Sequence, residues 1–264
     1  MSTTISRAGL LLGIVFLLSA CRKTEEPAAT QVTKYRLSSS RFYYVDGSYY
    51  NVKYVYSDAG RLIREEQTRS DGAPMAFKDF QYVDGKLSVM TLRSASAVVA
   101  EFRYLYEGDR LAKTEYLELN NKVASVPVFD RTLTYEGDQV VRITTRYRTD
   151  SASYYDRFTY AGSNVASVKT YSLIGDKLLH ETTLEYDSHL NPFFALTLAE
   201  PGNARYSSKN NILKMKTVRS SQTTMDDFRM SYEYNTAGYP TRQFIEFPDG
   251  KKHSEQTFEY TTIP

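Results

Sequence analysis

A tyrosine, a polar turn and a small apolar residue recur along most of the chain, and this repeat limits the folds that the sequence can adopt. Clear copies read YVYSDAGRL at 54–62, YVDGKL at 82–87, YEGDRL at 106–111 and YEGDQV at 135–140. The marker tyrosines that stand before each turn are Tyr56, Tyr82, Tyr106, Tyr135, Tyr160, Tyr186, Tyr206, Tyr234 and Tyr260. Their spacing averages about 25.5 residues, and Tyr206 is the weakest member. A fixed period in this range indicates an array of one supersecondary unit.

Each copy has the pattern of a β-hairpin. The marker tyrosine usually follows an apolar residue two places earlier, with a mostly polar residue between them, as in Phe80, Gln81 and Tyr82. This alternation is typical of a half-buried strand whose aromatic face meets the core. Asp84 and Gly85 then supply the positive φ angles of a tight turn, and an apolar residue begins the next strand. The repeat therefore predicts about eight hairpins in sequence.

The composition agrees with an all-β fold. The chain has 23 tyrosines and 13 phenylalanines, which favour strands, and no stretch after residue 30 keeps a helical period of apolar residues. Eight hairpins form a long antiparallel up-and-down meander, which must curl because an open sheet would expose two edges and an aromatic face. Charges such as Arg64 and Glu66 on one strand face leave no band for lipid. We therefore predict one barrel-like but soluble domain over residues 31–264.

The first twenty residues have the pattern of an export signal. After Arg7, the run 8–20 is apolar apart from Ser19 but too short to span a bilayer. The sequence LSAC at 18–21 resembles the lipobox of bacterial lipoproteins, which implies that Cys21 becomes the lipidated first residue of the mature chain. Residues 21–30 are charged and small, and they predict a flexible tether.

Two families resemble the repeat region. The stretches YSDAGRL at 56–62 and YNTAG at 234–238 look like the YD repeats of Rhs-type toxin shells, although those shells are far longer. The segments NPF at 191–193 and SKNN at 208–211 are similar to short Bacteroidetes lipoproteins of unknown function with a porin-like fold. That resemblance implies a porin-like barrel and an outer-membrane or cell-surface location, and it implies no activity.

Catalytic, metal and nucleic-acid sites have little support in the sequence. The 33 basic and 31 acidic residues nearly balance, without a basic block that would bind nucleic acid. The adjacent acid pairs at 65–66 and 226–227 fall in predicted strands, where neighbours point to opposite faces, so we interpret them as solvated edge charges. His180, His189 and His253 lack metal-ligand spacing. We expect no catalytic residue, no metal and no cofactor.

The repeat breaks between Asn191 and Asn211, which makes this segment the candidate binding site. Pro192 cannot donate to a strand ladder, and segments that leave a rigid array often carry function. The candidate residues are Asn191, Pro192, Phe193, Phe194, Tyr206, Lys209, Asn210 and Asn211. The alternative is that Phe193 and Phe194 only fill the barrel lumen.

These features predict a cell-envelope lipoprotein that binds or scaffolds and does not catalyse. Its partners would be the membrane, through Cys21, and either an envelope protein or a glycan. The alternatives are a glycan-binding or glycan-processing accessory protein, although the absence of tryptophan disfavours glycans, and a YD-repeat-like shell fragment.

A modification site is also predicted. The tripeptide at 150–152 resembles the O-glycosylation acceptor of Bacteroidetes, with Ser151 as the acceptor. The alternative is an ordinary loop serine.

Overall fold

The structure is a computed structural model that describes residues 34–120, 123–124, 126–148, 152–194, 196 and 200–263. The chain divides into two units, residues 1–33 and residues 34–264. The barrel lies in the second unit. The signal and tether, with Cys21, lie outside the described residues, and so does Ser151.

The described chain is almost entirely β-strand, and its one helix is α1 (Ala204–Ser207). The strands are β1 (Lys34–Tyr43), β2 (Tyr49–Tyr56), β3 (Leu62–Arg69), β4 (Pro74–Val83), β5 (Lys86–Ser94), β6 (Val98–Glu107), β7 (Arg110–Asn120), β8 (Val123–Ala124), β9 (Phe129–Glu136), β10 (Gln139–Tyr147), β11 (Tyr154–Ala161), β12 (Asn164–Ser172), β13 (Leu178–Leu190), β14 (Asn210–Arg219), β15 (Thr224–Tyr234), β16 (Pro240–Glu246) and β17 (Lys252–Ile263).

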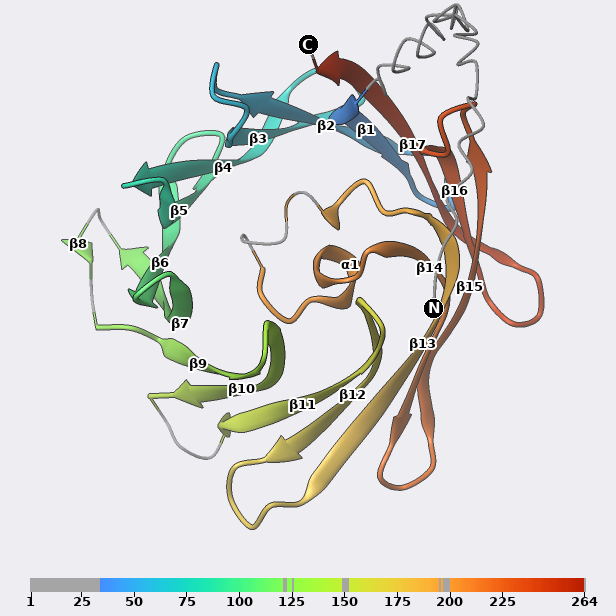
Figure 1. The fold of residues 1–264 in the computed structure, drawn as a ribbon. Helices are drawn as coiled ribbons and strands as arrows, with labels where there is room; N and C mark the ends of the chain where they lie inside the picture. The colour runs from blue at the N-terminus through green and yellow to red at the C-terminus, as the bar shows by residue number, and fades with distance from the viewer. Residues whose placement is uncertain are drawn as a thin grey trace, which may run out of the picture. The chain divides into compact units, whose positions relative to one another are not determined.

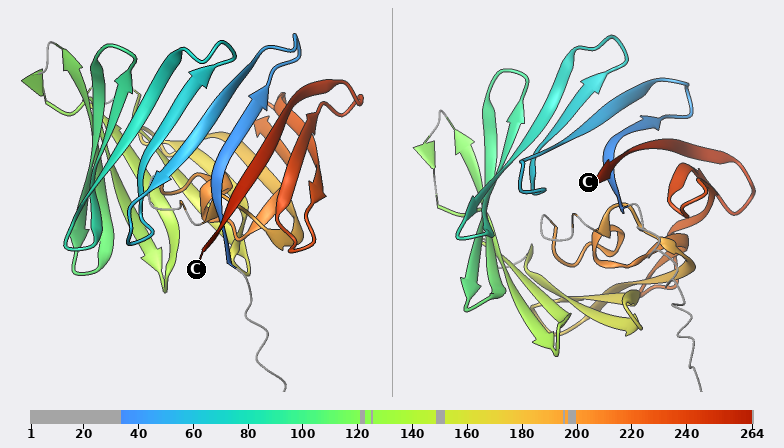
Figure 2. Two further views of the ribbon diagram at one scale, coloured as in Figure 1. Left: turned by 90° about the horizontal axis from the view of Figure 1, so that it is seen from above. Right: turned by 45° about the horizontal axis from the view of Figure 1, so that its top comes forward.

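Sixteen of these strands form a closed antiparallel barrel (Figure 1). Each strand pairs with the next one along the chain, except that β7 pairs directly with β9 in the barrel wall, while the two-residue β8 pairs only with the end of β7. The barrel closes because β1 pairs with β17, from Lys34 opposite Ile263 to Tyr43 opposite Glu255. Figure 2 shows the tilted strands from the side. The predicted all-β meander and its curling into a barrel are confirmed.

The sequence repeat corresponds to a repeated break in strand register. Tyr82 lies opposite Leu87, but the preceding Gln81 lies opposite Val89, so Ser88 bulges from the ladder. The same shift occurs beside Tyr56, Tyr106, Tyr135, Tyr160, Tyr186, Tyr234 and Tyr260. Such bulges bend and twist a strand, which helps the sheet to close.

Two details of the repeat differ from the prediction. The partner of Tyr260 is Leu37 of β1, so the eighth unit is assembled from the two ends of the chain. Tyr206 is not a marker tyrosine, because it lies in α1 within the connection from β13 to β14. The short step before Tyr206 is therefore part of an insertion and not a hairpin.

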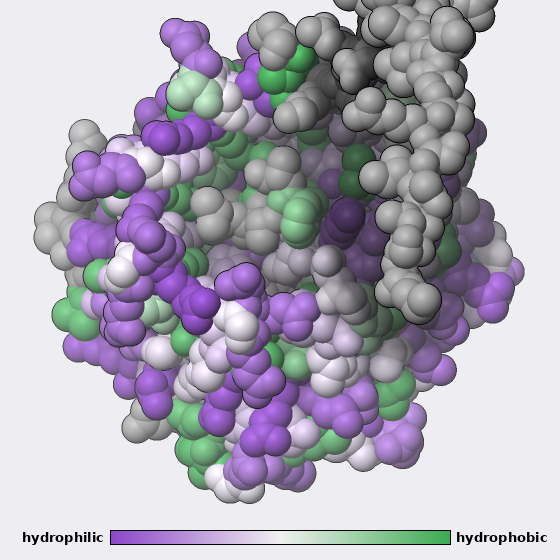
Figure 3. Space-filling model, viewed as in Figure 1, coloured by the Kyte–Doolittle hydropathy of each residue, from purple (hydrophilic) through white to green (hydrophobic). Residues whose placement is uncertain are grey.

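The lumen holds the apolar core and the outer wall carries the charges. Alternation along each strand points side chains such as Leu62, Phe80 and Tyr104 inward, where they are buried. The outer face has cross-strand ion pairs, for example Lys214 of β14 with Glu185 of β13. In the view of Figure 3, the visible side chains are mostly hydrophilic, with hydrophobic residues scattered among them.

Candidate functional site

One end of the barrel is distinguished by its connections, and we call it the tyrosine end. Six short turns there follow marker tyrosines, at 57–61, 84–85, 108–109, 137–138, 162–163 and 235–239. The seventh connection runs from 191 to 209 and is called the inserted segment. Figure 1 shows its helix α1 inside the ring of strands. The sequence therefore breaks its repeat where the chain enters the lumen.

Buried hydrogen bonds hold the start of the inserted segment. The Asn191 side-chain amide donates to the carbonyl oxygens of Arg205 and Ser208, at 2.5 and 2.8 Å, and its Oδ1 accepts from the Phe193 backbone N–H at 3.0 Å. The Phe193 ring packs edge-on against Phe258 of the wall. The Arg205 guanidinium lies 4.1 Å above the same ring.

Polar contacts to two strands hold the exit of the inserted segment. Ser208 is fully buried, and its hydroxyl oxygen accepts from the Val165 backbone N–H at 3.1 Å. The same hydroxyl lies 2.8 Å from the hydroxyl of Tyr186. Asn210 exchanges two hydrogen bonds with Asn164, at 2.9 and 3.0 Å. These contacts fix the segment to β12 and β13 across the lumen.

The structure separates the eight predicted site residues into three groups. Asn191, Pro192, Phe193 and Asn211 are buried, Tyr206 and Asn210 are half-buried, and Phe194 and Lys209 are exposed. The alternative interpretation placed Phe193 and Phe194 in the lumen; Phe193 is buried in the apolar core there, and Phe194 is exposed. Phe194 is 42% exposed and contributes to the walls of two cavities. The role of all eight in binding stays a prediction.

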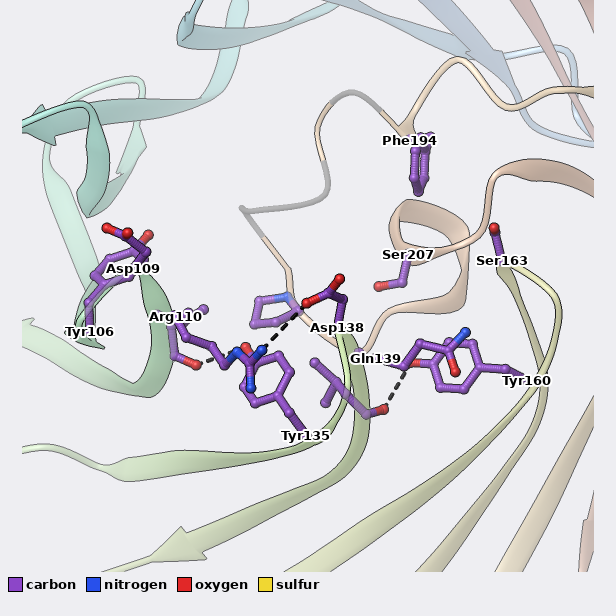
Figure 4. Close-up of a pocket in the computed structure, with 14 residues that line it drawn as sticks. Tyr106, Asp109, Arg110, Tyr135, Asp138, Gln139, Tyr160, Ser163, Phe194 and Ser207 are labelled. Carbon is purple, nitrogen blue, oxygen red and sulfur yellow. Dashed lines mark hydrogen bonds and ion pairs between the residues drawn. The ribbon is translucent and has the colours of Figure 1, made fainter.

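The larger cavity, of about 860 Å³, lies between the inserted segment and the strand ends of β6 to β12. Tyr106, Tyr135 and Tyr160 line it, with charged side chains at the turns. Figure 4 shows these residues together with Phe194 and Ser207, which come from the inserted segment. The volume falls within the usual range for small-ligand pockets.

The smaller cavity, of about 520 Å³, lies on the other side of Phe194. Apolar wall residues that include Leu62, Phe80 and Leu87 form part of its lining, and Arg36 and Arg61 also line it. The inserted segment therefore contributes to two cavities at the tyrosine end, and their lining residues differ in chemistry.

A hydrogen-bond ladder explains why tyrosine recurs. The Tyr82 hydroxyl donates to the Leu62 carbonyl at 2.9 Å, and the Tyr160 hydroxyl donates to the Val140 carbonyl at 2.8 Å. Equivalent bonds join the marker tyrosines Tyr56, Tyr135, Tyr186 and Tyr260 to the carbonyl of an apolar residue near the start of a strand one hairpin earlier. In the unit of Tyr234, the residue that makes this bond is Tyr232, to the Ile212 carbonyl, while Tyr234 itself donates to Asp187. Tyr106 breaks the ladder, because its buried hydroxyl has no partner among the described residues.

Basic side chains cover four of the tyrosine rings, a feature that the sequence interpretation missed. The pairs are Arg36 over Tyr56 at 4.2 Å, Arg61 over Tyr82 at 5.6 Å, Lys86 over Tyr106 at 5.5 Å and Arg110 over Tyr135 at 5.0 Å. Each cation directly precedes the apolar residue that begins a strand. The repeated dipeptides Arg61-Leu62, Lys86-Leu87 and Arg110-Leu111 were the available signal.

A second polar cluster was also missed. The buried carboxylate of Asp187 accepts hydrogen bonds from the Tyr234 hydroxyl and the Asn211 side-chain amide. The His189 ring stacks on Tyr234 with 3.9 Å between ring centroids. Burial and the hydrogen bond to Asp187 raise the pKa of Tyr234. These four residues join β13, β14 and β15 beside the inserted segment.

The acid pair at 65–66 differs in part from its interpretation. Its two side chains point to opposite faces, as predicted, but Glu65 is buried in the lumen and is not a solvated edge charge. Its carboxylate lies 3.5 Å from the Lys78 ammonium, which also lies 3.4 Å from Glu200. Within the part of the chain that the structure describes, no three histidine, cysteine or acidic side chains are grouped so that they could hold a metal ion.

Comparison with known proteins finds similarity at the level of structure. No family model matches the chain, and no curated protein matches it. A porin-like protein from Bacteroides uniformis has 13% identity and a TM-score of 0.52, over 86% of this chain and 96% of that one. Another from Bacteroides vulgatus has 13% identity and a TM-score of 0.56, over 86% and 99%. At this identity the likeness shows the fold alone, and the predicted porin-like fold is confirmed.

A third match adds nothing to the functional argument. A chain in the TcdB2–TccC3–Cdc42 complex matches with 13% identity, over 82% of this chain and 14% of that one, but the TM-score is 0.34. In the described residues, no helix is both long enough and apolar enough to span a bilayer.

Proposed function

We propose that the chain is a non-catalytic binding module of the bacterial cell envelope, tethered by a lipid on Cys21, and that the larger cavity holds its ligand. The observation that carries this proposal is the cavity itself. Three tyrosines and the inserted segment enclose about 860 Å³ at one end of a rigid barrel. Such concave sites with a few convergent polar groups are the usual form of a binding site.

The charges on the outer wall support a barrel that stands in water. Arg64 pairs with Asp79 at 2.5 Å and Arg242 pairs with Glu255 at 2.6 Å, both on outward strand faces. A barrel embedded in a bilayer presents an apolar band to lipid instead. Attachment through Cys21 would then supply the membrane association.

The chemistry of the larger cavity favours a neutral ligand rich in hydroxyl groups, such as a glycan. The rim has carboxylates from Asp109 and Asp138, the guanidinium of Arg110, the amide of Gln139 and the hydroxyl of Ser163. Charges of both signs and an amide offer donors and acceptors together. The tyrosine rings add amphipathic surface. This mixed rim suits a sugar better than a strongly charged ligand.

Binding at the larger cavity can be tested with a glycan array followed by titration of each hit. We expect the double variant Asp138→Asn and Ser163→Ala to weaken binding of a hit roughly tenfold, since two polar contacts are changed. The matched control is Asp249→Asn, an exposed turn residue at the opposite end of the barrel. Equal affinity in all three proteins, or no hit on a broad array, would contradict a glycan site in the larger cavity.

The anchor is tested separately. Cys21→Ala is expected to move the protein from the membrane fraction to the soluble fraction of a bacterial host that lipidates exported proteins. Cys21→Ala protein that still sediments with membranes after a high-salt wash would contradict the tether.

A further inference from the structure

The smaller cavity differs from the larger one in the sign of its charge. Arg36 and Arg61 are its charged lining residues, and no carboxylate lies among the described residues of that lining. The deeper lining is apolar and includes Leu62, Phe80 and Leu87. The smaller cavity is thus a pocket with a hydrophobic interior and a purely cationic charge.

Among the described residues, neither arginine has an ionic partner. The described residues contain no carboxylate within ion-pair distance of either guanidinium, and the Nε of Arg36 is buried without a hydrogen-bond partner. Each guanidinium instead lies over a tyrosine ring, Tyr56 for Arg36 and Tyr82 for Arg61. Arg61 is exposed to solvent, whereas the Arg36 Nε is buried. A buried donor without a partner is costly, and a bound anion would satisfy it.

The other two basic residues that cover tyrosine rings, Lys86 and Arg110, do have carboxylate partners. The lack of such a partner therefore distinguishes the two arginines of the smaller cavity. Lys86 lies 2.7 Å from the Asp109 carboxylate, and Arg110 lies 3.4 Å from Asp138. All four basic residues have the same place in the repeat and the same position over a tyrosine. Two are neutralised by the next turn and two are not, and the two that are not line the same cavity.

We propose that the smaller cavity binds an amphiphile with a single carboxylate, such as a medium-chain fatty acid. Arg36 and Arg61 would hold the carboxylate, since a guanidinium matches its planar geometry with paired hydrogen bonds. The alkyl chain would enter the apolar interior towards Leu87 and Leu196, which are buried. The volume of about 520 Å³ lies within the range of small-molecule sites. This site is separate from the glycan site and does not depend on lipidation of Cys21.

The test uses residues 21–264 with Cys21→Ala and measures binding by calorimetry below the micelle concentration of each probe. The probes are decanoate, decanol, decyltrimethylammonium and acetate. Decanoate is expected to bind at least about tenfold more tightly than each of the other three, because only decanoate has both the anion and the chain. Equal binding of decanoate and decyltrimethylammonium would overturn the proposal, and so would the absence of decanoate binding.

Variants locate the site. The double variant Arg36→Gln and Arg61→Gln is expected to lose roughly tenfold or more in decanoate affinity. The matched control Arg110→Gln changes the cation of the larger cavity and should bind decanoate within about twofold of the parent protein.

A second variant keeps the test decisive if the arginine variants fold poorly. Ile263 lines the smaller cavity, is 39% exposed, and lies at the end of β17. Ile263→Glu adds a negative charge there and should weaken decanoate binding several-fold compared with Ile263→Gln. Equal affinity of these two variants, or equal loss in the double arginine variant and Arg110→Gln, would place decanoate elsewhere and overturn the proposal.

Discussion

The tyrosine end contains two kinds of connection between otherwise equivalent strands. Six are turns of two to five residues, and the seventh is the inserted segment of 19 residues at 191–209. Both kinds begin after a marker tyrosine and end before a register bulge, as Tyr160 and Tyr186 show. The strand pair that carries the long connection has one further register irregularity, between Tyr186 and Leu190, but stays paired on both sides of it. What changes is the lumen, which the inserted segment occupies.

The difference between the two kinds lies in how they are held. A short turn is fixed by its own residues, as where the Asn235 side chain accepts from the backbone N–H groups of Ala237 and Tyr239. The inserted segment is fixed by partners far away in sequence, such as Val165 and Asn164. Local rules thus build the wall, whereas non-local contacts build the cavities. Each kind of contact can be tested by changing it separately.

We expect the largest effect from high pH, which ionises the buried tyrosines of the repeat. Burial raises the pKa of Tyr56, Tyr160 and Tyr186 from 10.0 to about 12. Between these values the unfolded chain loses protons that the folded barrel keeps, so stability is full below pH 10 and falls as pH rises towards 12. We expect cooperative loss of the strand signal in circular dichroism over this range, together with phenolate absorbance. Phenolate absorbance that develops fully near pH 10, with the barrel intact, would contradict the buried ladder.

A large effect is also expected when the start of the inserted segment loses its buried amide. Asn191→Ala leaves two carbonyl oxygens and one N–H without their partner, and this should lower the free energy of unfolding by roughly 3–4 kcal/mol. Asn235→Ala removes an amide from a short turn and should cost about 1 kcal/mol. Urea unfolding measures both. Similar losses in the two variants would mean that the inserted segment depends on its internal hydrogen bonds no more than a short turn does.

The wall could be predicted from the sequence because its rules are local. Alternation, turn residues and the spacing of tyrosines each repeat within one hairpin, so the pattern indicates the barrel without knowledge of distant contacts. The curling of the sheet toward a barrel followed from the cost of exposed edges, whereas full closure by pairing of β1 with β17 did not. The same reliance on spacing produced the error at Tyr206, where a tyrosine in the inserted segment was counted as a repeat.

The candidate site could be predicted only in outline. The broken repeat located the inserted segment, but the cavities depend on which wall residues it meets. Neither the contact of Ser208 with Val165 nor the shared position of Phe194 between two cavities has a local sequence signal. Glu65 was misassigned for the same reason, since its partner Lys78 lies on the next strand and Glu200 lies in the inserted segment.

We expect an intermediate loss in the free energy of unfolding when alanine replaces one of two glycines that share a positive φ. Gly202 lies in the inserted segment, close to the barrel wall, and has a φ of +84°. A Cβ at this position would lie 2.3 Å from Ile143 Cδ1 and 3.1 Å from Phe158 Cζ. Gly175 has φ +74° in a turn at the opposite end, with open space around it. Gly202→Ala should cost roughly 2–3 kcal/mol and Gly175→Ala about 1 kcal/mol. Thermal unfolding of the two variants tests whether contact with the wall adds to backbone strain.

The smallest effects come from removing single hydroxyl groups, and they sharpen the comparison most. The Tyr186 hydroxyl donates to the Val165 carbonyl at 2.7 Å and also contacts the buried Ser208 hydroxyl at 2.8 Å. In a regular unit, Tyr160 has the carbonyl bond alone, and the buried Tyr106 hydroxyl has no partner among the described residues. We expect Tyr186→Phe to cost about 2 kcal/mol, Tyr160→Phe about 1 kcal/mol, and Tyr106→Phe to be neutral or slightly stabilising.

The order of these three values is the informative result. All three substitutions remove one oxygen from the same position of the repeat, so differences in strand propensity and ring packing largely cancel. The remaining difference is the number of partners that each hydroxyl serves. A loss at Tyr186 equal to that at Tyr160 would mean that Ser208 contributes nothing to holding the inserted segment. A loss at Tyr106 equal to that at Tyr160 would mean that the ladder bond itself adds little, and the tyrosines would then recur for the burial of their rings alone.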